Sequence, residues 1–353
     1  NNTDNKNNVD DIPGDSRSGT GKYIAATIAT NISVDHYNNN DASLEGYKEE
    51  SAQQCPLAIL NKAKNTLERN PNCPGSTPFM VTKPLDTTKQ ITFFLIYFND
   101  HHHLAHQIDS WSKFSKNALQ EIQFVIVDDG SAPGHTAIEF LEANRALAKP
   151  LDIVIYKIDQ NLVWNIGGAR NLGFWMANTP WVFMSDGDIR VQPETMDYVV
   201  NIKNQQYQNS TSNNVFVLFQ RLRDNKKTLK PHPAVMLVRK VDYWLAGGCD
   251  EDFVGHYGQT DPHFRYRVDK HPALNLVETH KLMKKDHVPP LLELEDNIGC
   301  PEGITTCLTS FKGEKPSRDT KPNYDLLQKK IAAGNWSNEF LRFTWKQMVI
   351  NWH

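Results

Sequence analysis

The sequence predicts an α/β fold with a doubly wound, mostly parallel sheet, and two observations predict it. Residues 91–98 form a continuous apolar run, which is typical of a strand buried on both faces. Three further apolar segments, at 122–127, 153–158 and 181–184, follow at intervals that leave room for a helix between them. Strands that alternate with helices indicate parallel strands joined by helical crossovers.

The segments between these strands have apolar residues at helical spacing. Two later apolar segments, 215–219 and 234–238, predict further strands. The expected helices cover 104–114, 136–147, 168–176 and, near the C-terminus, 325–333.

The length of 353 residues suggests about two domains, or one large domain with extensions. Residues 1–87 are predicted to form a polar arm, because 1–40 are rich in Asn, Asp, Ser, Gly and Thr. The arm is expected to end in a short helix over 51–70, where apolar residues recur at helical spacing. Residues 291–353 are expected to form a C-terminal extension that packs on the large domain.

The composition excludes some classes of partner. The 353 residues include 38 Lys and Arg against 41 Asp and Glu, which gives a net charge of −3. Nucleic-acid binding is not expected, because a protein that binds phosphates must carry an excess of positive charge at the interface. The longest apolar run, 91–98, is far shorter than the roughly 20 residues that span a bilayer, so no transmembrane helix is expected.

Cysteines and glycosylation signals favour the lumen of the secretory pathway over the cytoplasm. The spacings of Cys55 with Cys73 and of Cys300 with Cys307 suit local disulfides, which leaves Cys249 unpaired. Reduced thiols in a cytoplasmic protein are the alternative. Asn-X-Ser/Thr triplets begin at Asn1, Asn31, Asn209 and Asn335. The polar arm is typical of a stalk that joins a lumenal domain to a membrane anchor, and the start at Asn1 fits removal of such an anchor.

Acidic residues follow three of the predicted strands. The segments are NDHHH at 99–103, DDGS at 128–131 and SDGD at 185–188. Ligands of doubly wound sheets bind beyond the carboxyl ends of the strands, so these segments predict a binding site. The three histidines of the first segment are expected in an exposed loop over that site, with a metal-binding tract as the alternative.

Asp186 and Asp188 are predicted metal ligands. Gly187 lets the backbone turn between them, so that both carboxylates face one point. Oxygen ligands of this kind suit Mg²⁺ or Mn²⁺ that bridges to a diphosphate. His263 and His287 are the candidates for a third ligand, and a solvated turn is the alternative for the acidic pair.

Two further segments have groups suited to a nucleotide. A carboxylate of Asp128 or Asp129 could accept a hydrogen bond from a base N–H, or could cap the following helix. Gly168, in the run GGARNLG at 167–173, permits close approach of a phosphate at a helix start, and Arg170 adds donors for its oxygens. The alternatives are a glycine-rich turn and an arginine paired with a surface acid, and the GxGxxG spacing of dinucleotide-binding folds is missing.

The segment 245–267 holds acids between glycines and aromatic residues. One of its carboxylates could act as a general base toward a hydroxyl group. Glu251 and Asp252 are instead expected in a solvated acidic turn.

Five motifs together resemble the GT-A-type glycosyltransferases, specifically their inverting family 2, over about 91–287. In the order of that family they are Phe98-Asn99, VDDGS at 127–131, GGARNLG at 167–173, DGD at 186–188 and GGCDEDF at 247–253. The resemblance implies a single GT-A catalytic domain over 88–290. It also implies a UDP-, GDP- or TDP-sugar donor, with UDP favoured over GDP, and Mn²⁺ or Mg²⁺ as the metal.

The resemblance further implies roles for single residues. Asp128 would bind the base, Arg170 the diphosphate or ribose side, and Asp186 the ribose or sugar. Asp188 would ligate the metal, and Asp261 would be the catalytic base. The donor site would be completed by Phe98, Asn99, Asp129, Gly168, Asn171 and Gly187. His263 stands where the family usually has an acid, which is a departure from its pattern.

The expected function is metal-dependent, inverting transfer of a hexosyl or pentosyl group from a nucleotide sugar to a hydroxyl of a glycan or glycoconjugate. One alternative is a sugar-nucleotide nucleotidyltransferase, which should carry a glycine-rich basic loop where this chain has 99–103. The other is a non-catalytic carbohydrate-binding module of the same fold. Aromatic residues that could stack on sugar rings are Trp164, Trp175, Trp244 and Tyr257, with a place in the core as the alternative expected for most of them.

Overall fold

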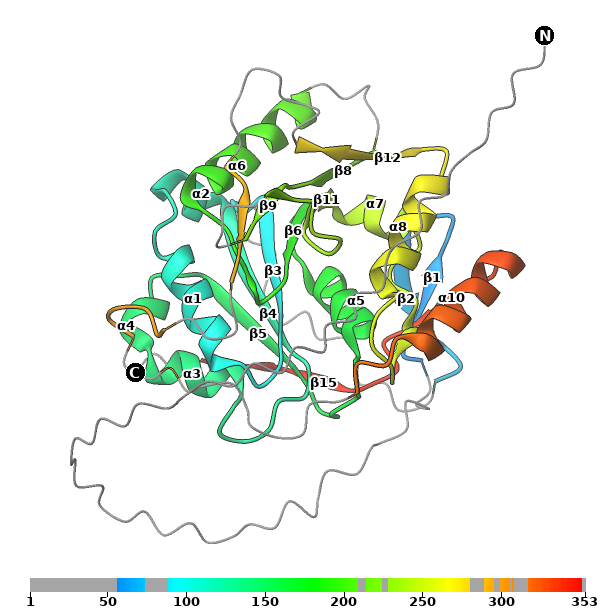
Figure 1. The fold of residues 1–353 in the computed structure, drawn as a ribbon, viewed down its shortest axis with the longest axis horizontal. Coiled ribbons are helices and arrows are strands. Elements are labelled where there is room, and N and C mark those ends of the chain that lie inside the picture. The colour runs from blue at the N-terminus through cyan, green and yellow to red at the C-terminus, as the bar shows by residue number, and fades with distance from the viewer. Residues whose placement is uncertain are drawn as a thin grey trace, which may run out of the picture. The chain divides into compact units, whose positions relative to one another are not determined.

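A central sheet of eight strands organises the fold (Figure 1). The structure is a computed structural model that describes residues 56–73, 88–208, 214–223, 228–279, 289–294, 299–304, 307 and 317–350. All of these residues belong to the unit Lys48–His353. The strands of the sheet have the order β12-β8-β11-β6-β3-β4-β5-β15.

The middle of the sheet consists of the strands that the apolar runs predict. They are β3 (Ile91–Tyr97), β4 (Ile122–Asp128), β5 (Ile153–Ile158) and β6 (Trp181–Ser185). β3 pairs in parallel with β4 and with β6, and β4 pairs in parallel with β5. Their carboxyl ends therefore lie along one edge of the sheet, where ligands bind in folds of this kind.

The outer strands make the sheet mixed but mostly parallel. They are β8 (Asn214–Leu218), β11 (Met236–Arg239), β12 (Leu274–Glu278) and β15 (Trp345–Met348). β12 is parallel to β8, whereas β11 is antiparallel to both β6 and β8, and β15 is antiparallel to β5. The predicted α/β class is confirmed.

Helices pack on both faces of the sheet. One face carries α1 (His101–Trp111), α2 (Lys116–Glu121), α3 (Ala137–Ala143), α4 (Arg145–Ala148) and α6 (Pro193–Gln208). The other carries α5 (Ile166–Met176), α7 (Lys240–Leu245) and α8 (Thr260–Lys270). Each helix group buries its apolar side chains in a separate core cluster.

Adjacent residues of β3 contribute side chains to the two different cores, because successive side chains of a strand point to opposite faces. Phe93 packs against Trp111 of α1, with 5.2 Å between ring centroids. Phe94 lies on the other face beside Gly173 of α5, where a Cβ would lie 2.1 Å from the Phe94 ring. Glycine at 173 therefore allows α5 to approach the sheet closely.

The helix expected over 51–70 is wrong where the structure describes that segment. β1 (Ala58–Asn61) and β2 (Thr66–Arg69) instead form a hairpin, joined by a turn that contains Asn65 at a φ of 51°. β14 (Glu339–Phe340) adds a third strand to this small sheet. Ala58 and Leu67 are buried in the core on the α5 side, so packing against distant residues overrides the local helical spacing.

A second small sheet lies beside the carboxyl end of β6. It consists of β7 (Ile189–Arg190), β9 (Arg221–Leu222), β10 (Thr228–Leu229) and β13 (Leu291–Glu293), in the order β10-β9-β13-β7. The C-terminal part of the chain contains α10 (Lys321–Ala333), which begins a few residues before the predicted helix and ends at Gly334 with a φ of 57°.

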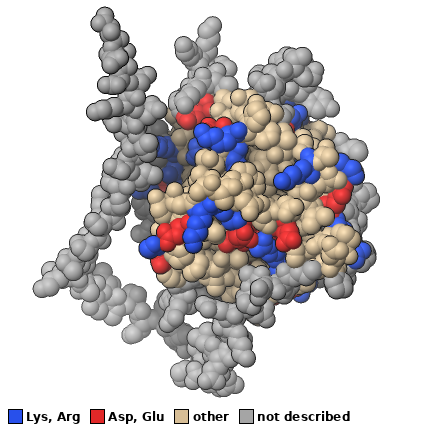
Figure 2. Space-filling view, turned by 90° about the vertical axis from the view of Figure 1, so that its right-hand side faces the viewer, with Lys and Arg blue, Asp and Glu red and all other residues tan. Residues whose placement is uncertain are grey.

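Charges of both signs are interspersed over the described part of the face that carries α8 and α10 (Figure 2). This mixture differs from the continuous basic stripe that is typical of a nucleic-acid interface. None of the helices within the described residues is long and apolar enough to cross a membrane.

The predicted disulfide between Cys300 and Cys307 is wrong for this structure, because both thiols are free. Cys249 is free and buried, as expected. The pairing expected for Cys73 involves Cys55, which lies outside the described residues. Of the four glycosylation triplets only that of Asn335 is described, and Asn335 is exposed just after α10.

Candidate active site

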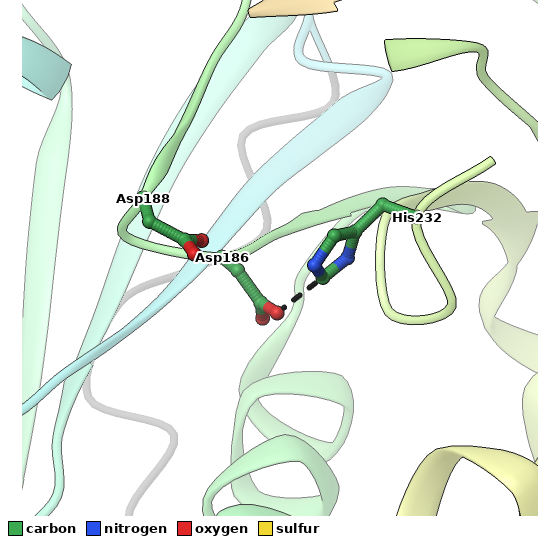
Figure 3. A group of neighbouring side chains, drawn as sticks. All are labelled: Asp186, Asp188 and His232. Carbon is green, nitrogen blue, oxygen red and sulfur yellow. Dashed lines mark ion pairs between the residues drawn. The ribbon is translucent and has the colours of Figure 1, made fainter. Parts of the chain in front are cut away.

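Asp186 and Asp188 lie at the carboxyl end of β6, in the turn between β6 and β7. With His232 they form a group whose potential ligand atoms all lie within 4.8 Å of one another (Figure 3). The His232 ring is directed toward Asp186, with 3.6 Å between Nδ1 of His232 and Oδ2 of Asp186. The two predicted acidic ligands thus gain a third residue that the sequence analysis missed.

The sheet explains why His232 reaches this place. His232 lies in the segment that joins β10 to β11, and β11 pairs antiparallel with β6, with Met236 opposite Met184. The beginning of β11 therefore lies beside the end of β6, where Asp186 begins the turn. No local sequence signal marks His232, and only the pairing of these two strands could have identified it.

The electrostatics at Asp188 disfavour two isolated negative charges. Burial and then the neighbouring Asp186 carboxylate raise the pKa of Asp188, whereas His232 and His103 lower it. A divalent cation would remove the repulsion between the two carboxylates. Two carboxylates with an imidazole fit Mn²⁺ better than Mg²⁺, because Mg²⁺ favours a shell made of oxygen atoms. The residues present therefore fit a divalent metal.

α1 holds the acidic turn in place. The Nε2 amide of Gln107 donates hydrogen bonds to the carbonyls of Gly187 and Ile189, both at 2.8 Å. The Gln107 side chain is fully buried, so these bonds are shielded from water. Gly187, a predicted donor-site residue, thus has its carbonyl turned toward α1.

The histidines at 101–103 are not an exposed loop, and that expectation is wrong. They form the first turn of α1 and are buried. Asp100 caps the helix by accepting the backbone N–H of His103 at 3.0 Å, and it contacts Nδ1 of the same residue at 2.5 Å. Burial alone would raise the pKa of Asp100, but the hydrogen bonds from His103 bring this pKa below its ordinary value. The capping carboxylate therefore explains why this polar run is helical.

Arg170 joins the metal group to the candidate base. It lies in α5 with 2% of its surface exposed, and it forms salt bridges with Asp261 and, at 3.7 Å, with Asp186. Burial opposes the charge, but the Asp261 and Asp186 carboxylates raise the pKa of Arg170 above its ordinary value. Asp261 lies in the first turn of α8, and its side chain is 25% exposed. The structure thus brings together three residues from three separate motifs.

The carboxylates after β4 accept hydrogen bonds from the protein. Asp128 accepts the backbone N–H groups of Ser131 and Ala137, both at 2.9 Å, and so helps to hold the N-terminus of α3, whose N-cap residue is Thr136. Asp129 accepts the Asn165 side-chain amide at 3.0 Å. Burial raises the pKa of Asp128, and it raises the pKa of Asp129 to about 7.

Asn99 and Phe98 follow β3 at the same edge of the sheet. Asn99 has a φ of 51°, accepts the N–H of Ala132 at 2.8 Å, and donates its own N–H to Ser131 Oγ at 2.9 Å. These bonds fasten the end of β3 to the loop after β4. The Phe98 side chain is one of few large apolar groups left exposed among the described residues, at 39%. An exposed aromatic side chain therefore lies at the same edge of the sheet as the loop after β4.

Comparison with known proteins identifies the domain that carries these groups. Residues 93–249 match the model of the family described as Glycosyl transferase family 2. They form a glycosyltransferase family 2 domain. No curated protein sequence matches the chain.

Solved structures with similar folds are remote. Residues 1–349 of TarS from S. aureus, in complex with UDP-GlcNAc, align with a TM-score of 0.46 and 12% identity, over 60% of each chain. The mannosyltransferase PcManGT from Pyrobaculum calidifontis, in complex with GDP-Man and Mn²⁺, aligns with a TM-score of 0.40 and 14% identity, again over 60% of each chain. The chain thus covers less than two thirds of either structure.

The family 2 match ends before Asp261, and the end of the matched segment is tied to α5 by a buried hydrogen-bond centre. Asn171 of α5 donates to the carbonyl of Cys249 and to Oε1 of Glu251, both at 2.8 Å. Its Oδ1 accepts the Tyr243 hydroxyl at 2.7 Å. Both polar atoms of the Asn171 side chain, a predicted donor-site residue, therefore have hydrogen-bond partners inside the protein.

Glu251 is buried, so its expected place in a solvated turn is wrong. Its carboxylate accepts the backbone N–H groups of Leu341 at 2.9 Å and Arg342 at 3.2 Å. Asp252 is exposed, as expected, but it pairs with Lys330 and Arg342. The partners of both acids lie in the C-terminal part of the chain, which the local sequence does not reveal.

Gly168 serves packing in this structure. A Cβ at that position would lie 2.3 Å from Oδ1 of Asn165 and 2.5 Å from the Phe343 ring. In this structure Asn165 and Phe343, rather than a phosphate, approach Gly168 closely. A contact between Gly168 and a phosphate stays a prediction.

Of the two histidines predicted as third metal ligands, neither belongs to the described metal group. His263 is fully buried between Phe253 and Trp336, with ring centroids 5.1 and 6.0 Å away. Burial lowers its pKa to about 3, so this imidazole is neutral. His287 lies outside the described residues.

Proposed function

We propose that this protein is a metal-dependent, inverting glycosyltransferase that moves a sugar from a nucleotide-diphosphate sugar to a hydroxyl of a glycan or glycoconjugate. The family 2 domain supports glycosyl transfer. The position of Arg170 supports a shared metal and catalytic site most strongly, because its guanidinium pairs with both Asp186 and Asp261. One buried side chain thus contacts both the proposed metal ligand and the proposed base, which supports a common site for them.

The donor is proposed to bind along the carboxyl ends of β3, β4 and β6. The exposed face of Phe98 can stack on a base, and the largely buried carboxyl of Asp129 is proposed to meet the edge of that base. Because burial raises the pKa of Asp129 to about 7, that carboxyl can also donate a hydrogen bond near neutral pH. Uracil and guanine both carry hydrogen-bond donors and acceptors that Asp129 could meet, and we favour UDP over GDP because the family resemblance implies it.

Asp186, Asp188 and His232 are proposed to hold Mn²⁺. A bound divalent ion would supply positive charge to the leaving diphosphate. The buried Gln107 keeps the acidic turn in one conformation, so the ligand groups are positioned before the donor arrives.

Asp261 is proposed to be the general base. Arg170 orients its carboxylate, and its partial exposure leaves an oxygen open to an acceptor. The acceptor hydroxyl gives its proton to Asp261 while its oxygen bonds to the anomeric carbon. The bond from that carbon to the diphosphate oxygen breaks, and the nucleoside diphosphate leaves with the electron pair. This single displacement inverts the anomeric centre.

A panel of UDP- and GDP-sugars tests the proposal. We expect Mn²⁺-dependent release of a nucleoside diphosphate, which EDTA abolishes, from at least one donor. Asp188→Ala should remove metal-dependent donor binding in calorimetry. Release of pyrophosphate from a nucleoside triphosphate would indicate a nucleotidyltransferase instead. Sugar binding without any turnover would indicate a non-catalytic module.

A further inference from the structure

Three loops meet next to the first turn of α8. The N–H of Gly255 donates to the carbonyl of Val163 at 2.6 Å, which ties the loop before α8 to the loop before α5. Nε1 of Trp164 donates to the carbonyl of Ser317 at 3.0 Å, which adds the segment before α10. The side chain of Asn323 donates to the carbonyl of Gly258 at 2.9 Å. The three loops are therefore fixed to one another by hydrogen bonds.

An aromatic pair lies at this junction. The rings of Trp164 and Tyr257 meet edge to face, with 4.8 Å between centroids and 61° between planes. Both side chains are half-buried, whereas the aromatic residues of the two cores are buried. The indole nitrogen is hydrogen-bonded, so its ring has a fixed orientation. The pair is thus a rigid apolar surface that water still reaches.

The backbone on both sides of the pair is unusual. Trp164 has a φ of 52°, and Gln259 has a φ of 68°, both in the left-handed region that glycine favours. For a residue as large as tryptophan this conformation is costly, and it persists only where the surroundings enforce it. Such conformations concentrate at binding sites. The local geometry therefore supports a ligand-binding role for this aromatic pair.

A cation stands beside the aromatic surface. The guanidinium of Arg318 lies 5.5 Å from the centroid of the Tyr257 ring. Arg318 is exposed and forms no salt bridge with any residue in the described ranges. Its fork of donors is therefore open to a negatively charged group on a ligand.

The surface is next to the proposed catalytic base. Tyr257 lies in the turn that leads into α8, whose first turn holds Asp261. Trp164 lies in the loop that leads into α5, whose Arg170 pairs with Asp261. The two aromatic residues are thus attached to the two elements that form the Arg170–Asp261 pair. A ring bound on them would therefore lie on the side of the site that α5 and α8 form.

We propose that Trp164, Tyr257 and Arg318 form the acceptor subsite, and that the acceptor is a carbohydrate with a negatively charged substituent. The C–H face of a pyranose would pack on the aromatic pair, and a carboxylate, sulfate or phosphate would pair with Arg318. The inference rests on the proposed function, because it assigns this surface to the acceptor of that reaction.

Equilibrium binding without a donor tests the subsite separately from catalysis. The probes are a disaccharide that contains glucuronic acid, its carboxyl-reduced neutral form, and its sulfated form, measured by saturation-transfer NMR and calorimetry. We expect both acidic probes to bind more tightly than the neutral one. Tyr257→Ala should weaken all three by about tenfold or more, which is the order of one lost aromatic contact. Arg318→Gln should weaken only the acidic probes.

Matched variants separate the loss of the subsite from general effects of substitution. Tyr324→Ala removes an exposed tyrosine of α10, 51% exposed, and should leave all probes unchanged. Arg318→Lys should retain part of the preference for acidic probes, because it keeps the charge but loses the fork. Donor affinity, measured with UDP and Mn²⁺, should be the same in all four variants. Asp261→Asn should bind the probes normally.

Two results would overturn the subsite. One is an unchanged ratio of acidic to neutral affinity in Arg318→Gln, and the other is normal probe binding in Tyr257→Ala. Neither result would touch the proposed function, which fails separately if no nucleotide sugar is turned over with Mn²⁺. Equal loss of UDP affinity in Tyr257→Ala would reassign the surface to the donor.

Discussion

Single residues in this protein act through buried contacts that join distant segments. Arg170 is the main example, because its buried charge is stabilised by the carboxylates of Asp261 and Asp186. The segment containing His232 reaches Asp186 through the pairing of β11 with β6. Arg170 could be selected from its sequence motif, but its partners could not, since each lies on another element. His232 could not be selected from the local sequence at all.

Removal of His232 tests its place in the metal group. We expect His232→Ala to weaken Mn²⁺ binding by about tenfold to a hundredfold, at least the loss typical of outer-shell partners. Calorimetry with Mn²⁺ alone measures this without a donor. His256, which is exposed just before α8, provides the control, and His256→Ala should bind Mn²⁺ normally. Equal affinity in the two variants would remove His232 from the site.

The carboxyl of Asp129 should make stability depend on pH. Burial raises its pKa to about 7, so the folded state favours the protonated form. A raised folded-state pKa gives stability that is complete below the unfolded value near 4 and is lost as pH rises toward 7. In that window the contribution falls by up to about 1.4 kcal/mol for each pH unit.

Asp129→Asn should remove this dependence, since asparagine imitates the protonated acid and can still accept the amide of Asn165. Urea denaturation at pH 4.5 and at pH 7 would show the variant gaining stability relative to the native protein at the higher pH. A difference between the two proteins that is the same at both pH values would contradict the assignment.

At the scale of elements, the C-terminal segment fixes the loop that leads to Asp261. Glu251 accepts backbone N–H groups from Leu341 and Arg342 and the side-chain amide of Asn171, and Asn323 donates to the carbonyls of Phe253, His256 and Gly258. The base therefore depends on contacts that lie outside the family 2 match.

Glu251→Gln should destabilise the protein by about 1–3 kcal/mol, because an amide nitrogen would replace an acceptor of buried N–H groups. Asp252→Asn is the matched control. Its carboxylate is exposed, and Lys330 keeps Asp250 as a second partner, so the loss should be less than about 1 kcal/mol. Urea denaturation compares the two variants, and equal losses would contradict a special role for Glu251.

The elements show which parts of the fold were predictable. β3, β4, β5 and β6 were, because each is an apolar run buried on both faces and needs no partner to be recognised. The hairpin of β1 and β2 was not, since its short strands are defined by pairing and by burial against α7 and β14. Glu251 was misjudged for the same reason, as its partners come from the end of the chain.

At the scale of the whole molecule, the protein extends beyond its family 2 domain. β15 continues the central sheet beside β5, and Phe340, Leu341 and Phe343 are buried in the core on the α5 side. The predicted C-terminal extension contributes a strand and core residues to the same unit as the catalytic segment.

Removal of residues 334–353 should therefore unfold the protein. Three buried apolar side chains each contribute about 1.5–3 kcal/mol, and their sum is comparable to the about 5–15 kcal/mol of a typical domain. Near-ultraviolet circular dichroism and thermal denaturation would show loss of tertiary structure and of a cooperative transition. A truncated protein with a native-like melting curve would show that the segment is dispensable.

Asp261→Asn tests the central claim most directly, because one substitution separates chemistry from donor binding. With a donor that the native protein uses, we predict that transfer falls by about 10²–10⁴-fold, the usual contribution of a general base. The affinity for UDP and Mn²⁺ should stay close to that of the native protein. Near-normal transfer by Asp261→Asn would contradict the assignment of the base and with it the proposed mechanism.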